Sequence, residues 1–192
     1  MPHTHSDIDE PVRVVEYDPA WPEQFDQERR EIERALGDAA THIEHVGSTA
    51  VPGLAGKPIV DLLIGVGDLE EASYHIDALV ALGYQNFGEI SIPGRIYLRK
   101  RGPRHFNIAL AVEGGEFWTT QLLLRDYLRA HVEEADAYAN EKRLAMVIGA
   151  RMFSTYSQAK GPFLSALVVR ARAWRRATTP AGHDRPSPRA PE

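Results

Sequence analysis

The sequence predicts an α/β domain whose last third is helical. Residues 59–66 (IVDLLIGV) form an apolar run, which is typical of a strand buried on both faces. Apolar residues between positions 21 and 36 recur at near-helical spacing and predict a helix with a core-facing stripe. Residues 116–176 have a helical pattern, with breaks expected near Gly149 and at residues 161–162.

The remaining elements follow from local signals. Pro22 suits the first position of a helix, and Gly37 marks the end of that helix. Residues 42–46 predict a short strand that runs into a glycine turn. Asp68 and Glu71 have the spacing of a capping box, before a helix that ends near Gly83. Residues 95–100 and 105–112 predict two strands joined by a turn at residues 101–103.

The composition disfavours or excludes several classes of function. The net charge of −5 disfavours a general nucleic-acid binder, which needs a broad basic face. The chain has no cysteine, which excludes disulfides, thiolate metal sites and cysteine nucleophiles. No apolar run approaches the ~20 residues of a membrane helix, and no signal peptide is apparent, so we expect a cytoplasmic protein. Residues 1–10 and the proline-rich residues 178–192 are expected to be disordered tails around a domain at 11–177.

The turn after the first predicted strand carries small polar residues. Gly47 is followed by Ser48 and Thr49, and glycine lets backbone N–H groups approach a phosphate while hydroxyls add short donors. Taken alone, the turn favours an ordinary strand-to-helix connection with Ser48 as a cap. The spacing of a P-loop is absent, because the residue six positions before Lys57 is Val51.

Asp61 is a carboxylate inside an apolar strand. Burying it without a partner would cost several kcal/mol or force it to be neutral. Two partners for Asp61 are compatible with the sequence. One is a structural ion pair with Lys57, four residues earlier, and the other is a metal ion.

The helical third repeats one pattern three times: a cation or phenol is followed four residues later by a cation, which places both side chains on one helix face. If these pairs face one cleft, they would bind an anion; alternatively, each faces solvent. A basic cluster at residues 99–104 has aromatic neighbours, which suits single-stranded nucleic acid, but it is more often a solvated hairpin end. The three pairs are Arg125 with Arg129, Tyr138 with Lys142, and Tyr156 with Lys160.

Residues 44–66 (EHVGSTAVPGLAGKPIVDLLIGV) resemble the signature stretch of the GrpB family, which is similar to the nucleotidyltransferase superfamily. Residues 15–25 (VEYDPAWPEQF) resemble the opening of that family, and residues 125–142 (RDYLRAHVEEADAYANEK) resemble its helical motif. The resemblance covers residues 14–174. It implies a nucleotidyltransferase-like mixed sheet flanked by helices, with a C-terminal helical cap.

The resemblance also implies a site. The Gly47–Ser48 turn would hold a nucleoside triphosphate, and Asp61 would hold Mg²⁺ that accompanies the nucleotide. The chain departs from the superfamily at Leu63, where a second acid is expected, and at Asn107, which stands in for a histidine and would be a weak metal ligand. A general base would be His45 or His105.

The resemblance therefore implies an enzyme that transfers a nucleotidyl group to a small-molecule acceptor, or activates that acceptor. The alternative is a module of the same fold that binds a nucleotide or anion without turnover. The phosphate-binding set would comprise Gly47, Ser48, Thr49, Lys57, Arg125, Arg129, Tyr138, Lys142, Tyr156 and Lys160.

Overall fold

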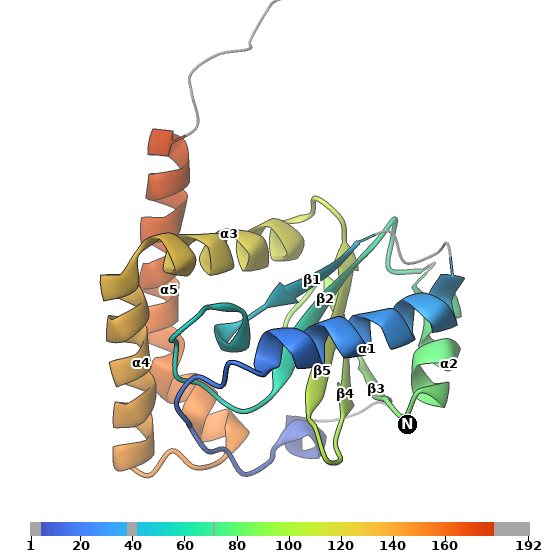
Figure 1. Cartoon of the computed structure of the whole chain (residues 1–192), viewed down its shortest axis with the longest axis horizontal. Coiled ribbons are helices and arrows are strands. Elements are labelled where there is room, and N and C mark those ends of the chain that lie inside the picture. Colours follow the sequence, from blue (N-terminus) through green and yellow to red (C-terminus); the bar gives the residue numbers. More distant parts are fainter. Residues whose placement is uncertain (1–4, 38–41, 71, 179–192) are drawn as a thin grey trace, which may run out of the picture.

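Five strands form one mixed sheet in the computed structural model, which describes residues 5–37, 42–70 and 72–178 (Figure 1). The spatial order is β1-β2-β5-β4-β3. Only β2 and β5 are parallel, and the other neighbours are antiparallel. The strands are β1 (Ile43–Val46), β2 (Val60–Val66), β3 (Gln85–Gly88), β4 (Arg95–Lys100) and β5 (Phe106–Val112).

Helices α1 (Trp21–Leu36) and α2 (Ser73–Ala81) cover one face of the sheet. The apolar stripe of α1 supplies Trp21, Phe25 and Ile32 to the main core, where they pack with the alternate residues of β2 that face this side. The other side of β2 is also apolar, apart from Asp61 near its start. The expected strand with two buried faces is therefore confirmed.

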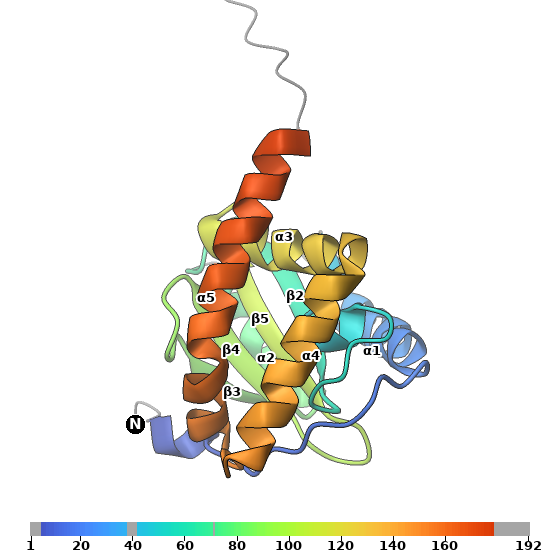
Figure 2. The same cartoon turned by 90° about the vertical axis from the view of Figure 1, so that its left-hand side faces the viewer.

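Three helices form the C-terminal helical cap on the other side. They are α3 (Glu116–Ala130), α4 (Val132–Val147) and α5 (Phe153–Thr178). Figure 2 shows α4 and α5 side by side in front of the sheet, with α3 crossing behind their upper parts. Their mutual core includes Leu128, Tyr138 and Leu167. Within the described residues, no helix is long and apolar enough to span a membrane.

The structure differs from the sequence analysis in three places: one strand was not predicted, and two local expectations were wrong. β3 was missed, because it is a short edge strand in which Phe87 is its one buried residue. Helix α2 has no side-chain cap and starts after Ala72; Glu71, the other half of the expected capping box, lies outside the described residues. Helix α5 continues through Pro162, since Tyr156 and Leu167 are buried on either side of it and this packing compensates for one lost backbone hydrogen bond.

The predicted N-terminal tail differs in its second half. Residues 5–8 form a short 3₁₀ helix, labelled η1 (His5–Ile8), and Ile8 is buried. Glu10 forms an ion pair with Arg101, and the backbone of Glu10 accepts a hydrogen bond from Phe153. These contacts tie the segment to the sheet and to α5. Residues 1–4 and 179–192 of the expected tails lie outside the described residues.

Candidate functional site

A cavity of about 340 Å³ lies between the sheet and the cap helices. This size is at the lower end of the range for small-molecule sites. Its floor is formed by β2, β4 and β5, one side by the turn after β1, and the roof by α3, α4 and α5. Ten of the predicted site residues line it: Gly47, Ser48, Thr49, Lys57, Asp61, Asn107, Arg125, Tyr138, Tyr156 and Lys160.

The turn after β1 requires glycine at position 47. Gly47 has φ +72°, and a Cβ atom there would lie 2.5 Å from Asp61 Oδ2. Gly56 has a related role, because a Cβ atom would lie 2.7 Å from Ser48 Cβ. Gly47 therefore lets the Asp61 side chain lie against the turn, and Gly56 lets its own backbone lie against Ser48. A side chain at either position would prevent the contact. Residues 48–50 continue as a single 3₁₀ turn, labelled η3 (Ser48–Ala50).

Lys142 of α4 holds the turn through two hydrogen bonds. Its side chain is 1% exposed, and Nζ donates hydrogen bonds to Ser48 Oγ (2.8 Å) and to the Ala55 carbonyl. Burial lowers the pKa of Lys142 to about 6, and the charge of Lys160 contributes. Lys142 is not among the residues that line the cavity. Because Ser48 Oγ accepts from Lys142, its own hydrogen remains available to a ligand in the cavity.

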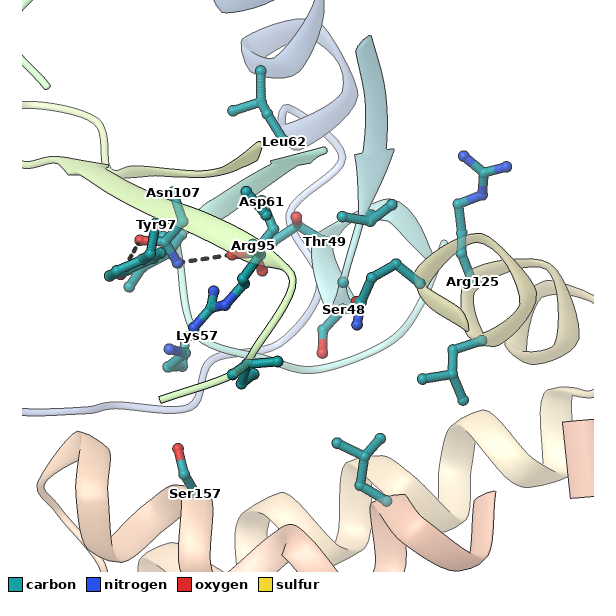
Figure 3. A pocket seen from close by; sticks show the side chains of 18 of the residues that line it. Ser48, Thr49, Lys57, Asp61, Leu62, Arg95, Tyr97, Asn107, Arg125 and Ser157 are labelled. Carbon is teal, nitrogen blue, oxygen red and sulfur yellow. Dashed lines mark hydrogen bonds between the residues drawn. The ribbon is translucent and has the colours of Figure 1, made fainter. Parts of the chain in front are cut away.

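Asp61 is held by Asn107 rather than by Lys57. Asn107 Nδ2 donates to Asp61 Oδ1 (2.7 Å), and the two residues are direct partners in the parallel β2–β5 register. The Asn107 oxygen accepts from Tyr97 Oη (2.9 Å), as Figure 3 shows, and also from Arg101 Nη2 (3.0 Å). Both lone pairs of that oxygen are thus occupied, which leaves none for the metal ion that Asn107 was expected to bind. Asn107 positions Asp61 instead.

Neither histidine is placed to act as a general base. His45 is buried, stacks on Phe25 with ring centroids 4.7 Å apart, and contacts Thr49 Oγ1 through Nε2 (2.9 Å). Burial lowers the pKa of His45 to about 4, which leaves it neutral at pH 7 and weakly basic. His105 is exposed, and neither histidine lines the cavity. The catalytic roles expected for both residues are therefore not supported; His45 positions Thr49.

Lys57 and Lys160 supply positive charge to the cavity. Lys57 Nζ lies 4.7 Å from the centroid of the Phe153 ring, and burial lowers its pKa to about 8. Lys160 Nζ donates to Tyr138 Oη (3.2 Å) and lies 5.2 Å from the centroid of Tyr156. The charge of Lys160 further lowers the pKa of Lys57, so the two cations repel each other in the free protein.

The expected arginine pair on α3 is used differently. Arg125 Nη1 donates to Glu44 Oε2 (2.6 Å), its Nε donates to Asp126 (2.8 Å), and its guanidinium points away from Ser48 in Figure 3. Arg129 lies outside the cavity and donates to the Ala50 carbonyl (2.9 Å). In the free protein both guanidinium groups are engaged by protein acceptors, and the phosphate-binding role expected for them stays a prediction. They fix α3 to β1 and the turn.

The basic cluster on the β4–β5 hairpin is largely engaged within the protein. Arg101 makes a two-bond ion pair with Glu10 (2.6 and 2.9 Å), and Lys100 pairs with the buried Glu28 (2.6 Å). Arg99 stacks over the Phe87 ring, with 4.5 Å between its guanidinium carbon and the ring centroid. These intramolecular contacts engage the positive charges that would otherwise bind the phosphates of a nucleic acid.

Sequence reasoning missed several lining residues. Arg95 and Tyr97 lie on β4, and Gln121, Phe153 and Ser157 come from α3 and α5. The alternation along β4 contained a usable signal for the first two. Positions 95 and 97 share the sheet face of Asp61, while Ile96 and Leu98 point into the opposite core.

The described residues do not form a site for a bare metal ion. No group of three or more His, Cys, Asp or Glu side chains is arranged to hold one in the described part of the chain. Asp61 is the single carboxylate among the described lining residues, and position 63, where the superfamily pattern has a second acid, is a core leucine. Mg²⁺ binds proteins through one or two carboxylates plus substrate phosphates. The donor set fits a metal only if a phosphate supplies most of the ligands.

Comparison with known proteins identifies relatives across most of the chain. The family model "GrpB protein" matches residues 11–170. A UPF0157 protein from Streptomyces coelicolor is 38% identical over 165 residues, which cover 86% of this chain and 87% of that protein. The UPF0157 protein YqkA from Bacillus subtilis is 33% identical over 166 residues, and the match spans 48% of its length.

Solved structures agree with this assignment. The crystal structure of the conserved protein GrpB from Enterococcus faecalis has a TM-score of 0.76 at 31% identity, covering 84% of this chain and 99% of that one. A chain of the GLD-2/RNP-8 complex has a TM-score of 0.51 at 14% identity, covering 76% of this chain and 58% of that one. The second likeness concerns the fold alone. The expected mixed sheet flanked by helices, with a C-terminal helical cap, is confirmed.

Proposed function

The chain belongs to the GrpB family, and we propose that its cavity binds a nucleoside triphosphate. One observation carries this proposal: Lys57, Lys160 and the hydroxyls of Ser48 and Thr49 converge on a cavity that contains one carboxylate. The two lysines have no carboxylate ion pair among the described residues, and their mutual repulsion is relieved by an anionic ligand.

The apolar lining favours a nucleotide over a simple polyphosphate. Leu124, Leu128 and Leu164 line the cavity together with the rings of Tyr138 and Phe153. A phosphate chain alone has no use for such a wall, whereas a base and ribose can pack against it. The triphosphate would lie along the Gly47–Ser48 turn and the lysines, with the base toward the cap helices.

Mg²⁺ would enter with the triphosphate. Asp61 Oδ2 is the carboxylate oxygen that Asn107 does not bind, so it can supply one ligand to an ion held mainly by phosphates. The ion would neutralise phosphate charge. Calorimetry of the free protein with Mg²⁺ alone is expected to show little binding below the millimolar range. Tight binding without nucleotide would contradict this donor set.

Nucleotidyl transfer is the second candidate, and the position of Asp61 Oδ2 beside Gly47 favours it. An acceptor hydroxyl oxygen would attack the α-phosphorus, the α–β phosphoanhydride bond would break, and pyrophosphate would leave with the electron pair. The hydroxyl proton would pass to solvent water, because Asp61 Oδ2 is the oxygen that would bind the ion. The absence of a second acid and of a cavity histidine among the described lining residues favours binding without turnover.

Thermal unfolding with each nucleoside triphosphate and Mg²⁺ or Mn²⁺ tests the binding proposal. A ligand at ~100 times Kd adds about 2.7 kcal/mol to the free energy of unfolding. For a domain of this size the melting temperature should rise by about 5–10 °C. Lys160→Met should reduce that rise, while Arg104→Met, an exposed cation outside the cavity, should not. If no triphosphate stabilises the wild-type protein, the proposal fails.

Asp61→Asn separates the two candidates. Asparagine keeps an oxygen that can accept from Asn107, so the free protein should melt within a few degrees of wild type. If the protein transfers a nucleotidyl group, this variant should bind triphosphate yet release no pyrophosphate. If wild type binds triphosphate and releases none with any acceptor tried, the binding module is the correct assignment.

A further inference from the structure

Arg95 carries a buried donor that the protein does not satisfy. It lies on β4 and lines the cavity. Its guanidinium carbon is 4.8 Å from the ring centroid of Tyr97 and 5.8 Å from that of Phe117. Its Nε is buried and has no hydrogen-bond partner among the described residues. A buried, unpaired donor on a charged group is costly, so such a group at a cavity wall is a candidate for binding a ligand.

The neighbouring acceptors are already occupied or too far away. Asp61 attracts Arg95 electrostatically, but its Oδ1 accepts from Asn107 and the two side chains form no ion pair. The Tyr97 hydroxyl donates to Asn107. The described residues therefore provide positive charge at Arg95 without a matching anion, and the matching group is left to a ligand.

Arg95 lies on the opposite side of Asp61 from the proposed triphosphate. In the strand order β1-β2-β5-β4, the Gly47–Ser48 turn follows β1, Asp61 is on β2, and Arg95 is on β4. At about 4.8 Å per strand, β4 lies roughly 10 Å from β2 across the sheet, and Arg95 is four residues along β4 from Arg99, the position level with Asp61. Between them Ala109 of β5 lines the cavity with a single methyl group, which keeps the floor open.

We propose that Arg95 binds the acceptor, and that the acceptor is a small molecule with a carboxylate or phosphate group held on the β4 side of Asp61. The inference rests on the proposed function, because it takes the turn side of Asp61 to be occupied by the triphosphate. A guanidinium presents a planar fork of donors that matches either anion, and the Tyr97 and Phe117 rings beside it attract its charge and hold it at the cavity wall. The acceptor hydroxyl would then lie near Asp61 while its anionic group binds Arg95.

Calorimetry on three variants and wild type tests this assignment. The α,β-methylene analogue of ATP with Mg²⁺ first saturates the triphosphate site, and succinate or inorganic phosphate is then titrated as the anionic probe. Arg95→Met keeps an apolar stem of similar length and removes the donors, and Arg95→Lys keeps the charge without the fork. Arg104→Met is the matched control, since Arg104 is exposed and outside the cavity. Melting curves verify that each variant folds.

We expect wild type and Arg104→Met to bind one of the probes equally well. Arg95→Met should weaken that probe at least tenfold, and Arg95→Lys should have an intermediate effect. The Kd of the ATP analogue should change less than threefold. The tighter probe identifies the anionic group as carboxylate or phosphate.

Two results would overturn the assignment: no Arg95-dependent binding of either probe, or a tenfold loss of analogue binding in Arg95→Met, which would place Arg95 in the triphosphate site. If the analogue binds no variant, the proposed function fails separately. The probes are then titrated into the free protein, where Arg95-dependent binding would still support an anion site on β4, and its absence would overturn it.

Discussion

Replacing Lys142 by Met should stabilise the free protein, although it removes the hydrogen bonds from Lys142 to Ser48 and to the Ala55 carbonyl. With a pKa lowered from 10.5 to about 6, the buried amine is neutral at pH 7 in the folded protein and charged in the unfolded chain. Removing that proton costs about 5 kcal/mol at pH 7, at about 1.4 kcal/mol per pH unit. Methionine avoids this cost but leaves the Ala55 carbonyl without its donor, a loss of about 1–3 kcal/mol. The net gain is about 2–4 kcal/mol.

The sign of the pH dependence makes this prediction specific. Because the folded pKa is lowered, the unfolded chain binds the extra proton between about pH 6 and 10.5, and wild-type stability rises with pH across that window. The advantage of Lys142→Met should be largest near pH 6 and should vanish by about pH 9. Urea unfolding from pH 6 to 9 measures it, with the exposed Arg30→Met as control. A variant less stable than wild type at pH 6 would show that burying the Lys142 amine does not destabilise the folded protein.

The other stability predictions concern residues around the turn and Asp61. As the pH falls from 6.5 to 4, wild type should lose up to about 3 kcal/mol of its free energy of unfolding, because the pKa of His45 is lowered to about 4 in the folded protein. His45→Gln should not show this loss, and urea unfolding across that pH range measures the difference. Asn107→Ala should lower the free energy of unfolding by about 2–4 kcal/mol, since it removes a buried link to Asp61; an unchanged urea midpoint would contradict that role. Gly47→Ala should cost at least twice as much as Gly53→Ala, because both have positive φ but only the first Cβ meets Asp61 Oδ2, and equal melting temperatures would argue against close approach.

Patterns with a strong physical cause could be predicted from the sequence. The period of α1, the two-faced burial of β2 and the hairpin at residues 101–103 were all recognisable, because each depends on local spacing and burial. The end of α3 at His131 could not be predicted, because no glycine or proline marks it in the sequence. The break expected at Pro162 is absent, because packing against α3 and α4 outweighs the local preference.

The candidate site was predictable in its parts but not in its hydrogen bonds. The sequence indicated Ser48, Asp61 and Lys160 as cavity residues, and they line one cavity. It could not indicate that Arg125 would be engaged by Glu44, because that choice depends on where α3 crosses β1. Arg95 was overlooked for the same reason, since its environment is created by strands and a helix that are distant in sequence.

A crystal structure of the protein with Mg²⁺ and a non-hydrolysable ATP analogue would test directly whether the cavity binds a nucleoside triphosphate. We expect phosphate oxygens within hydrogen-bond distance of Ser48 and Lys160, with Asp61 Oδ2 facing the α-phosphate or its metal ion. The Arg95 guanidinium should remain free of the triphosphate. An analogue bound elsewhere on the protein while this cavity stays empty would contradict the account.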